Sequence, residues 1–224
     1  MGAEMIDVAR TARHFRRAVT DSHRGETPYR HWTLVDVLPD EVGFGLISLP
    51  IAPLLIDDCH GVRDTDNQKR TFLTPWLQSR FPVCATLAQA LQRPEVARVM
   101  GETCGFEAEG SYLRIEYIQD IDGAWLEPHH DVPEKLCSMV IYLCTGPDAA
   151  EWGTDIYDDR LRWVGRSSAE FNSATIFIPG ANTWHGFEKR KIVGIRRLLE
   201  INYVHPRWRD RDQLCFPEQP VSLG

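Results

Sequence analysis

The chain has 224 residues, of which 43% are hydrophobic and 25% are charged, and its formal net charge at pH 7 is -7. This length and apolar content predict a single globular domain over residues 1–224, and the acidic balance argues against nucleic acid as a partner. No stretch approaches the roughly 18 apolar residues of a membrane helix, and the N-terminus lacks the apolar core of a signal peptide, so we expect a soluble cytoplasmic protein without a membrane partner.

The first part of the chain combines a helix with short strands. Apolar residues recur at spacings of three and four over residues 4–21, which predicts an amphipathic helix. Residues 31–39 and 43–50 are short apolar runs that end in proline, and we interpret them as two strands joined by a turn.

Residues 72–105 predict two or three further helices. Pro94 suits the first turn of the last helix, and Gly105 suits its end. Residues 1–107 should therefore form a helical and strand support for the rest of the domain.

The chain becomes rich in strands after this region. Short β-branched or aromatic runs are separated by Gly, Pro, Asp and Asn, as in SYLRIEYI, CSMVIYL, TDIYD, SATIFIPG and IRRLLEINYV. This succession predicts a mainly β fold with flanking helices, either a sandwich or a barrel.

Six cysteines occur without a CxxC pair, which favours neither a zinc site nor a disulfide framework. We expect them to be reduced and several to lie in the core: Cys59, Cys84, Cys104, Cys137, Cys144 and Cys215.

The segment WLEPHHD, which begins at Trp125, places two histidines and an aspartate at the end of a probable strand. On an extended chain His129 and Asp131 project to one face, whereas His130 projects to the other. An imidazole and a carboxylate on one face provide two ligands for a divalent metal. Taken alone, an HxD segment is more often a solvated His–Asp pair.

A third ligand would complete a site with two histidines and one carboxylate, which suits non-haem Fe(II) and oxygen chemistry. His185 follows the turn signal Pro179–Gly180 and lies in a β-rich run, although a packed core histidine is the alternative. The remaining histidines are less suitable because they lie in the first helix, in polar loops or beside strands: His14, His23, His31, His60 and His205.

The strand after His185 contains Arg196 and Arg197 within an apolar run. A buried arginine is costly unless it pairs with an anion, and its fork geometry suits a carboxylate. Because strand faces alternate, we expect only one of the two arginines to face the interior.

These residues together resemble the Fe(II)/2-oxoglutarate-dependent oxygenases, and at the level of motifs the prolyl-hydroxylase-like members. The family pattern is HxD, then a distal histidine, then an arginine or lysine on the last core strand. The resemblance implies a double-stranded β-helix, or jelly-roll, core over residues 108–206, followed by a C-terminal tail over 207–224.

The resemblance also assigns roles to individual residues. It implies Fe(II), 2-oxoglutarate and O2 as cofactor and cosubstrates, with three iron ligands: His129, Asp131 and His185. It places four further side chains at the 2-oxoglutarate: Arg196, Tyr142, Tyr117 and Ser138.

Some of these cosubstrate assignments have alternatives. Arg197 is the second choice for the carboxylate-binding arginine, and Val140 should share the inward face of Ser138 and Tyr142 by the period of two. The chain has Leu198 where many members have serine two residues after the arginine, which departs from the family pattern of cosubstrate anchoring.

The implied activity is hydroxylation of an unactivated C–H bond with release of succinate and CO2. Asp131 disfavours halogenation, since family halogenases replace this carboxylate, whereas desaturation or ring formation needs the same ligands. We expect a small polar metabolite such as an amino acid as substrate, with five candidate contacts between the core strands: Trp152, Asp155, Arg162, Trp163 and Asn172.

Three alternatives stay open at this stage. A peptide or protein side-chain hydroxylase would use the same metal and cosubstrate residues. A cupin-like isomerase or lyase would use the same jelly roll, and a non-catalytic binding module would use the histidines as structural residues.

Overall fold

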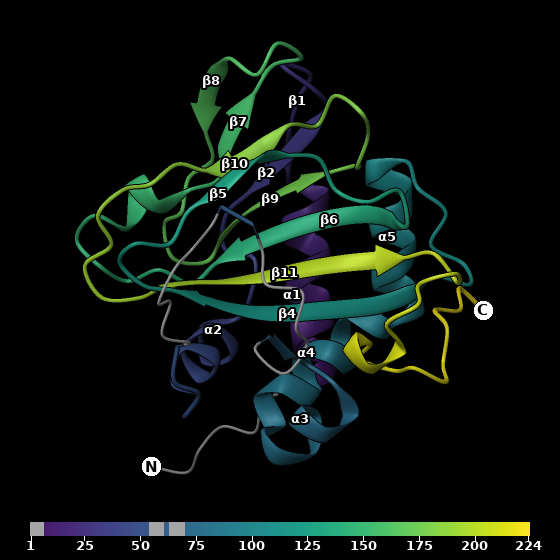
Figure 1. Cartoon of the computed structure of the whole chain (residues 1–224). Helices are drawn as coiled ribbons and strands as arrows, with labels where there is room; N and C mark the ends of the chain where they lie inside the picture. Colours follow the sequence, from purple (N-terminus) through teal and green to yellow (C-terminus); the bar gives the residue numbers. More distant parts are fainter. Residues whose placement is uncertain (1–6, 54–60, 63–69) are drawn as a thin grey trace.

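The computed structural model describes residues 7–53, 61–62 and 70–224. It consists of two antiparallel sheets and a layer of helices (Figure 1). The larger sheet has seven strands in the order β1-β2-β9-β6-β11-β4-β3. These strands are β1 (His23–Gly25), β2 (His31–Leu34), β3 (Thr71–Phe72), β4 (Tyr112–Asp120), β6 (Lys135–Tyr142), β9 (Ser173–Phe177) and β11 (Arg196–Val204).

The smaller sheet faces the larger one and has the order β5-β10-β7-β8. Its strands are β5 (Leu126–His129), β7 (Asp155–Tyr157), β8 (Trp163–Arg166) and β10 (His185–Phe187). Two short 3-10 helices, η2 (Ala149–Trp152) and η3 (Arg211–Gln213), lie in connections. The arrangement is a double-stranded β-helix with flanking helices, which confirms the predicted fold class.

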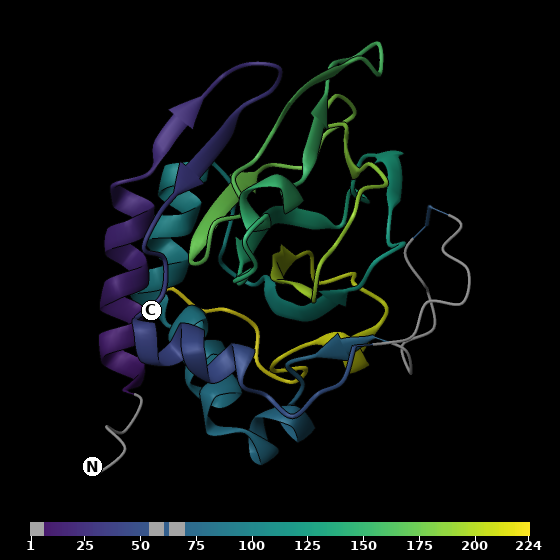
Figure 2. The ribbon, with the colours of Figure 1, turned by 90° about the vertical axis from the view of Figure 1, so that its left-hand side faces the viewer.

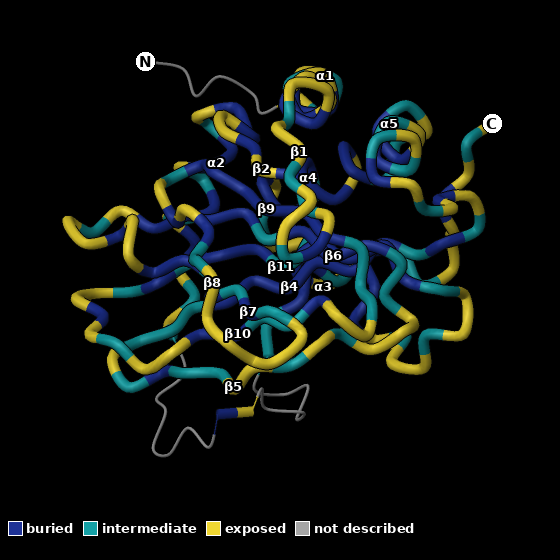
Figure 3. The backbone as a smooth tube through the Cα atoms, turned by 90° about the horizontal axis from the view of Figure 1, so that it is seen from above, coloured by how far each residue is buried: buried dark blue, intermediate teal, exposed yellow. Residues whose placement is uncertain are grey.

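The helices cover the face of the larger sheet that points away from the smaller one, so the molecule has three layers (Figure 3). They are α1 (Val8–Thr20), α2 (Asp40–Ile47), α3 (Pro75–Arg80), α4 (Pro82–Gln92) and α5 (Pro94–Cys104). We call the helix-covered face of the larger sheet its outer face, and the face toward the smaller sheet its inner face.

The helices predicted over residues 72–105 are confirmed as three. Each of them begins with proline in its first turn, where the missing N–H costs nothing. Gly105 ends α5 in the left-handed conformation, at a φ of 81°.

The strand predicted over residues 43–50 is wrong, because this segment belongs to α2. Pro39 precedes the helix. The carboxylates of Asp40 and Glu41 in the first turn interact favourably with the positive end of the helix dipole. Val42 and Leu46, four residues apart, are fully buried on one side of α2. The apolar run is too short for its periodicity to distinguish a helix from a strand.

Segments from both the N-terminal and the C-terminal parts of the described chain contact the larger sheet. Strand β2 extends the larger sheet beside β9, as Figure 2 shows. In the C-terminal segment, the Cys215 N–H donates to the Leu113 carbonyl at 2.9 Å, and the Val221 N–H donates to the Ser111 carbonyl at 2.7 Å. The segment predicted as a tail therefore packs beside the first residues of β4.

The five cysteines that the structure describes are free thiols and are buried, as expected. Cys59 and His60 lie outside the described residues. Within the described ranges, none of the helices is long and apolar enough to cross a membrane.

Candidate metal centre

His129, Asp131 and His185 lie together between the two sheets. Antiparallel pairing of β5 and β10 places His129 opposite His185, and their ring centroids are 4.4 Å apart. One ligand atom from each of the three residues lies within 4.8 Å of the other two. The sequence prediction of a shared face for His129 and Asp131 therefore agrees with the geometry.

His130 points away from this group. Its side chain is exposed, and its ring lies edge-on to Trp184 at a centroid distance of 4.8 Å. Because side chains alternate along a strand, His130 and Trp184 occupy the side of the smaller sheet opposite to that of His129 and His185.

Backbone carbonyls fix the orientation and the tautomer of both histidines. Nδ1 of His129 donates to the Glu127 carbonyl, and Nδ1 of His185 donates to the Thr183 carbonyl, each at 2.9 Å. Since a carbonyl only accepts, the proton of each neutral ring sits on Nδ1, and Nε2 keeps its lone pair for a metal.

The protonation states also suit a metal site. Burial lowers the pKa of His185 to about 4, so this ring is neutral at pH 7. Burial by itself would raise the pKa of Asp131, but the neighbouring Lys135 ammonium and other contacts outweigh this effect and the pKa is lowered. The group thus combines two imidazoles with one carboxylate, a donor set that leaves coordination positions open and fits Fe(II).

A pocket lies near His185, one of the three residues. The Phe177 ring in its wall is 4.8 Å from the His185 ring, so the pocket adjoins the ligand group. The wall consists of aromatic, aliphatic and hydroxyl side chains: Tyr29, Val140, Tyr142, Thr154, Ile156, Ser167, Thr175 and Phe177.

Three hydroxyl groups cluster in this wall. The Tyr142 hydroxyl lies 2.6 Å from Thr154 Oγ1 and 2.6 Å from Ser167 Oγ. The Thr154 N–H donates to both the Tyr142 and the Ser167 oxygens, at 3.1 and 2.9 Å. We call Tyr142, Thr154 and Ser167 the hydroxyl cluster.

The two adjacent arginines occupy opposite faces of β11. Arg196 is buried on the inner face, where its Nε donates to the Trp152 carbonyl at 2.6 Å and its Nη1 pairs with Asp120. Arg197 is partly exposed, and its Nε donates to Gln119 at 3.3 Å. Only one arginine therefore faces the interior, and a carboxylate of the protein already balances its charge.

Tyr117 does not reach the pocket. Its hydroxyl donates to the Leu46 carbonyl at 3.1 Å, and the ring packs in the core beneath the helices. The implied role of Tyr117 at the cosubstrate is therefore wrong for this geometry, because an odd position on β4 faces the outer side. Ser138 lies on the inner face but contacts Asp131 at 2.6 Å and does not line the pocket.

Three of the five candidate substrate contacts have structural roles instead. Trp152 is 1% exposed, and its indole N–H donates to the Lys191 carbonyl. Asp155 is fully buried and accepts from Trp163, Arg166 and the Glu188 N–H.

Asn172 holds the segment around Leu38 in place. Its Oδ1 accepts from the Leu38 N–H, and its Nδ2 donates to the Leu38 carbonyl. Arg162 pairs with Asp158 on the surface, and Trp163 is half-exposed on the β7–β8 hairpin. Of the five, only Arg162 and Trp163 are open to a ligand, and both lie on this outer hairpin.

Sequence reasoning missed several residues of the site. Tyr29, Thr154 and Ser167 line the pocket from irregular segments, where no periodicity reveals the direction of a side chain. Lys135 contacts Asp131 at 2.5 Å. A lysine four residues after the HxD aspartate, at the start of an apolar strand, was the available signal for it.

No family model matches the sequence. No curated protein matches it either. Solved structures do match. A prolyl-4-hydroxylase from Pseudomonas putida has a TM-score of 0.55 and 12% identity over 92% of this chain and 98% of that one.

Two further matches carry different names. A prolyl hydroxylase from Trichoplax adhaerens, solved with a hypoxia-inducible factor peptide, has a TM-score of 0.56 and 9% identity over 88% of this chain and 90% of that one. The non-haem α-ketoglutarate-dependent epimerase SnoN from nogalamycin biosynthesis has a TM-score of 0.52 and 13% identity over 96% and 94%. The chain therefore has the fold of the Fe(II)/2-oxoglutarate oxygenases, with a His-Asp-His group that can hold a metal ion.

Proposed function

We propose that the protein is an Fe(II)- and 2-oxoglutarate-dependent dioxygenase. The observation that carries this proposal is the convergence of His129, Asp131 and His185 with both histidine tautomers fixed for ligation. Iron held there would couple the oxidative decarboxylation of 2-oxoglutarate, which gives succinate and CO2, to oxidation of a substrate C–H bond. The residues of the chain would hold the metal, bind the dicarboxylate and limit access of water.

The pocket beside His185 is the proposed 2-oxoglutarate site. Its cavity volume in this structure is about 10 Å³, so the side chains of its wall would have to move apart to admit the cosubstrate. The keto-acid end would lie toward the three metal ligands, and the distal carboxylate would lie toward the hydroxyl cluster. Hydroxyl groups donate well to a carboxylate, and the aliphatic part of the cosubstrate would pack on Val140, Ile156 and Phe177.

Arg196 would act differently from the arginine of the family pattern. Asp120 and the Trp152 carbonyl already occupy two of its nitrogen atoms, and it does not line the pocket. We propose that the hydroxyl cluster supplies the direct contacts and that Arg196 supports the wall, with its guanidinium 4.0 Å from the Phe187 ring centroid.

We further propose a small polar metabolite as the substrate. The three ligands are partly buried, and Tyr29 and Phe177 in the adjoining pocket wall are only 5% and 4% exposed. This supports a substrate that enters as a compact molecule. A peptide side chain is the second candidate, because a neighbour of the same fold is a prolyl hydroxylase solved with a peptide.

The test is succinate release in air with Fe(II), 2-oxoglutarate and two matched panels, one of free amino acids and related metabolites and one of short peptides. We expect at least one metabolite to raise succinate formation well above the uncoupled background. His129→Ala should abolish both the stimulated and the uncoupled succinate formation. Stimulation by peptides alone would overturn the substrate class. Absence of succinate in every sample of folded, iron-loaded protein would overturn the enzyme class.

A further inference from the structure

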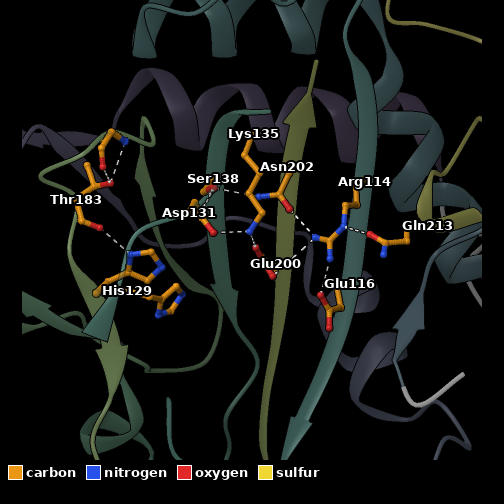
Figure 4. Close-up of polar contacts among 12 residues, drawn as sticks. Arg114, Glu116, His129, Asp131, Lys135, Ser138, Thr183, Glu200, Asn202 and Gln213 are labelled. Carbon is orange, nitrogen blue, oxygen red and sulfur yellow. Dashed lines mark hydrogen bonds and ion pairs between the residues drawn. The ribbon is translucent and has the colours of Figure 1, made fainter. Parts of the chain in front are cut away.

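The carboxylate of Asp131 is held from two sides by other side chains (Figure 4). Lys135 Nζ donates to Oδ1 at 2.5 Å, and the Ser138 hydroxyl donates to Oδ2 at 2.6 Å. Asp131 follows the end of β5, so no sheet ladder fixes its position. Two donors on different oxygens fix the rotation of the carboxylate, which a single donor would not.

Lys135 is itself held in place. Its ammonium also donates to Glu200 of β11, and its side chain is only 11% exposed. A buried ammonium between two carboxylates is stabilised only while both remain its partners. The position of Lys135 is therefore set by the larger sheet and is not left to the flexibility of its own chain.

Ser138 is held by one rung of the larger sheet. The strand register places Ser138, Asn202 and Arg114 side by side on β6, β11 and β4. Asn202 Nδ2 donates to the Ser138 oxygen at 3.0 Å, and Arg114 Nη1 donates to Asn202 Oδ1 at 2.6 Å. This leaves the Ser138 hydroxyl proton for Asp131.

The contacts through Glu200 and those through Asn202 meet at Arg114, which is 1% exposed. Its guanidinium pairs with Glu116 at 2.8 Å, bonds Gln213 at 2.7 Å, and lies 3.8 Å from Glu200. Figure 4 shows the whole series across the inner face, from Asp131 to Gln213. The network links the carboxylate to strands β11 and β4 of the larger sheet and to Gln213 in the C-terminal segment.

We propose that Lys135 and Ser138 are positioning residues, which hold the Asp131 carboxylate in the orientation that binds metal and are themselves fixed by the network through Glu200, Asn202 and Arg114. This inference rests on the proposed metal site. Partners that orient a ligand commonly change metal affinity 10- to 100-fold, on the order expected here for the loss of Lys135.

The competing explanation is that Lys135 belongs to a purely structural ion network. The two explanations differ in what each substitution changes. A positioning role makes metal affinity depend on the two residues that touch Asp131. If the role is purely structural, the loss of metal affinity in each variant should parallel its loss of stability, whichever residue of the network is substituted.

Arg70 offers the matched control. It pairs with Glu116 at 2.5 Å and its side chain is 15% exposed, so it is a partly buried cation, comparable with Lys135 at 11%, at the far end of the same network. It does not touch Asp131, and Glu116 keeps Arg114 as a partner when Arg70 is removed.

The experiment measures Mn(II) affinity by electron paramagnetic resonance, without 2-oxoglutarate or substrate, together with the thermal midpoint of each metal-free variant. We expect Lys135→Met to raise the Mn(II) Kd about 10- to 100-fold and Ser138→Ala to raise it several-fold, with Arg70→Met within about twofold of wild type. Ser138→Ala removes only one oxygen, so it decides the question if Lys135→Met does not fold.

Two results would overturn the proposal: wild-type affinity in both Lys135→Met and Ser138→Ala, or an equal loss in Arg70→Met. Failure of the proposed function looks different. In that case the variants would still differ in Mn(II) affinity, but the wild-type protein would bind the metal without converting 2-oxoglutarate.

Discussion

The outer and inner faces of the larger sheet differ sharply in composition, although alternate residues of the same strands form both. On β6 and β11 the outer face carries Met139, Ile141, Leu199 and Ile201, all at most 1% exposed and packed beneath the helices. The inner face of the same strands carries Val140 and Leu198 but is otherwise polar: Ser138, Tyr142, Arg196, Glu200 and Asn202. The outer face stabilises the fold, and the inner face holds the groups that can do chemistry.

The comparison predicts that the helix-covered side of the larger sheet and the space between the two sheets can be disrupted separately. The largest effect concerns His185, which lies on β10 of the smaller sheet, opposite the inner face. His185→Ala should abolish Mn(II) binding, because one of three ligands is lost and two rarely hold a first-row ion. The thermal midpoint of the metal-free protein should change little. Isothermal calorimetry with Mn(II) and a thermal melt check this, and retained micromolar binding would contradict the assignment of His185 as a ligand.

The outer face should show the opposite result. Ile201→Ala deletes apolar volume from a core site that is 1% exposed, and it should cost about 2–5 kcal/mol of unfolding free energy. The Mn(II) Kd of the folded fraction should stay within about twofold of wild type. Urea unfolding and the same Mn(II) titration measure both quantities, and a large change in Kd would show that the two faces are not independent.

The same substitution, tyrosine to phenylalanine, can be made once on each face of the larger sheet, so its effects on the two faces can be compared directly. Tyr142→Phe removes a hydroxyl from the proposed cosubstrate pocket and should raise the KM for 2-oxoglutarate about 5- to 10-fold, as expected for one lost hydrogen bond. Tyr203→Phe removes a hydroxyl that donates to the Leu91 carbonyl at 2.8 Å on the outer face, and should lower stability without changing KM. Equal KM values in the two variants would remove the hydroxyl cluster from the site.

The smallest effect concerns Asp155, outside the metal group. Burial alone would raise its pKa, but bonds from the Glu188 N–H, Trp163 and the paired arginines outweigh burial, so the pKa is lowered. A lowered carboxylate pKa contributes stability that is present above the unfolded value near 4 and is lost as the pH falls through the folded value. The difference in thermal midpoint between wild type and Asp155→Asn should therefore shrink as the pH drops below about 4, and a constant difference would contradict this role.

Much of the architecture was predictable from the sequence because its signals are local. The strands at 112–120, 135–142 and 196–204 follow from β-branched and aromatic runs, and HxD with alternation predicts the shared face of His129 and Asp131. Helix α2 was not predictable, because an eight-residue apolar segment fits either periodicity and packing decides.

The polar wall behind Asp131 shows what the sequence leaves undetermined. Arg114, Glu116 and Glu200 interrupt apolar strands, as Arg196 does, so alternation predicts that some charges face inward. Their partners depend on the register of β4 against β11, which places Arg196 beside Asp120 and Asn202 beside Arg114. The hydrophobic pattern fixes which face of each strand is buried, but it does not by itself identify which residues of two sequence-distant strands lie opposite each other.

The most direct test of the central claim is an anaerobic titration of the protein with Fe(II) and 2-oxoglutarate, followed by visible absorption. The wild-type protein and His130→Ala should develop a metal-to-ligand charge-transfer band at one equivalent of iron, whereas His129→Ala should develop none. A folded wild-type protein without the band, or an equal band in His129→Ala, would contradict the account.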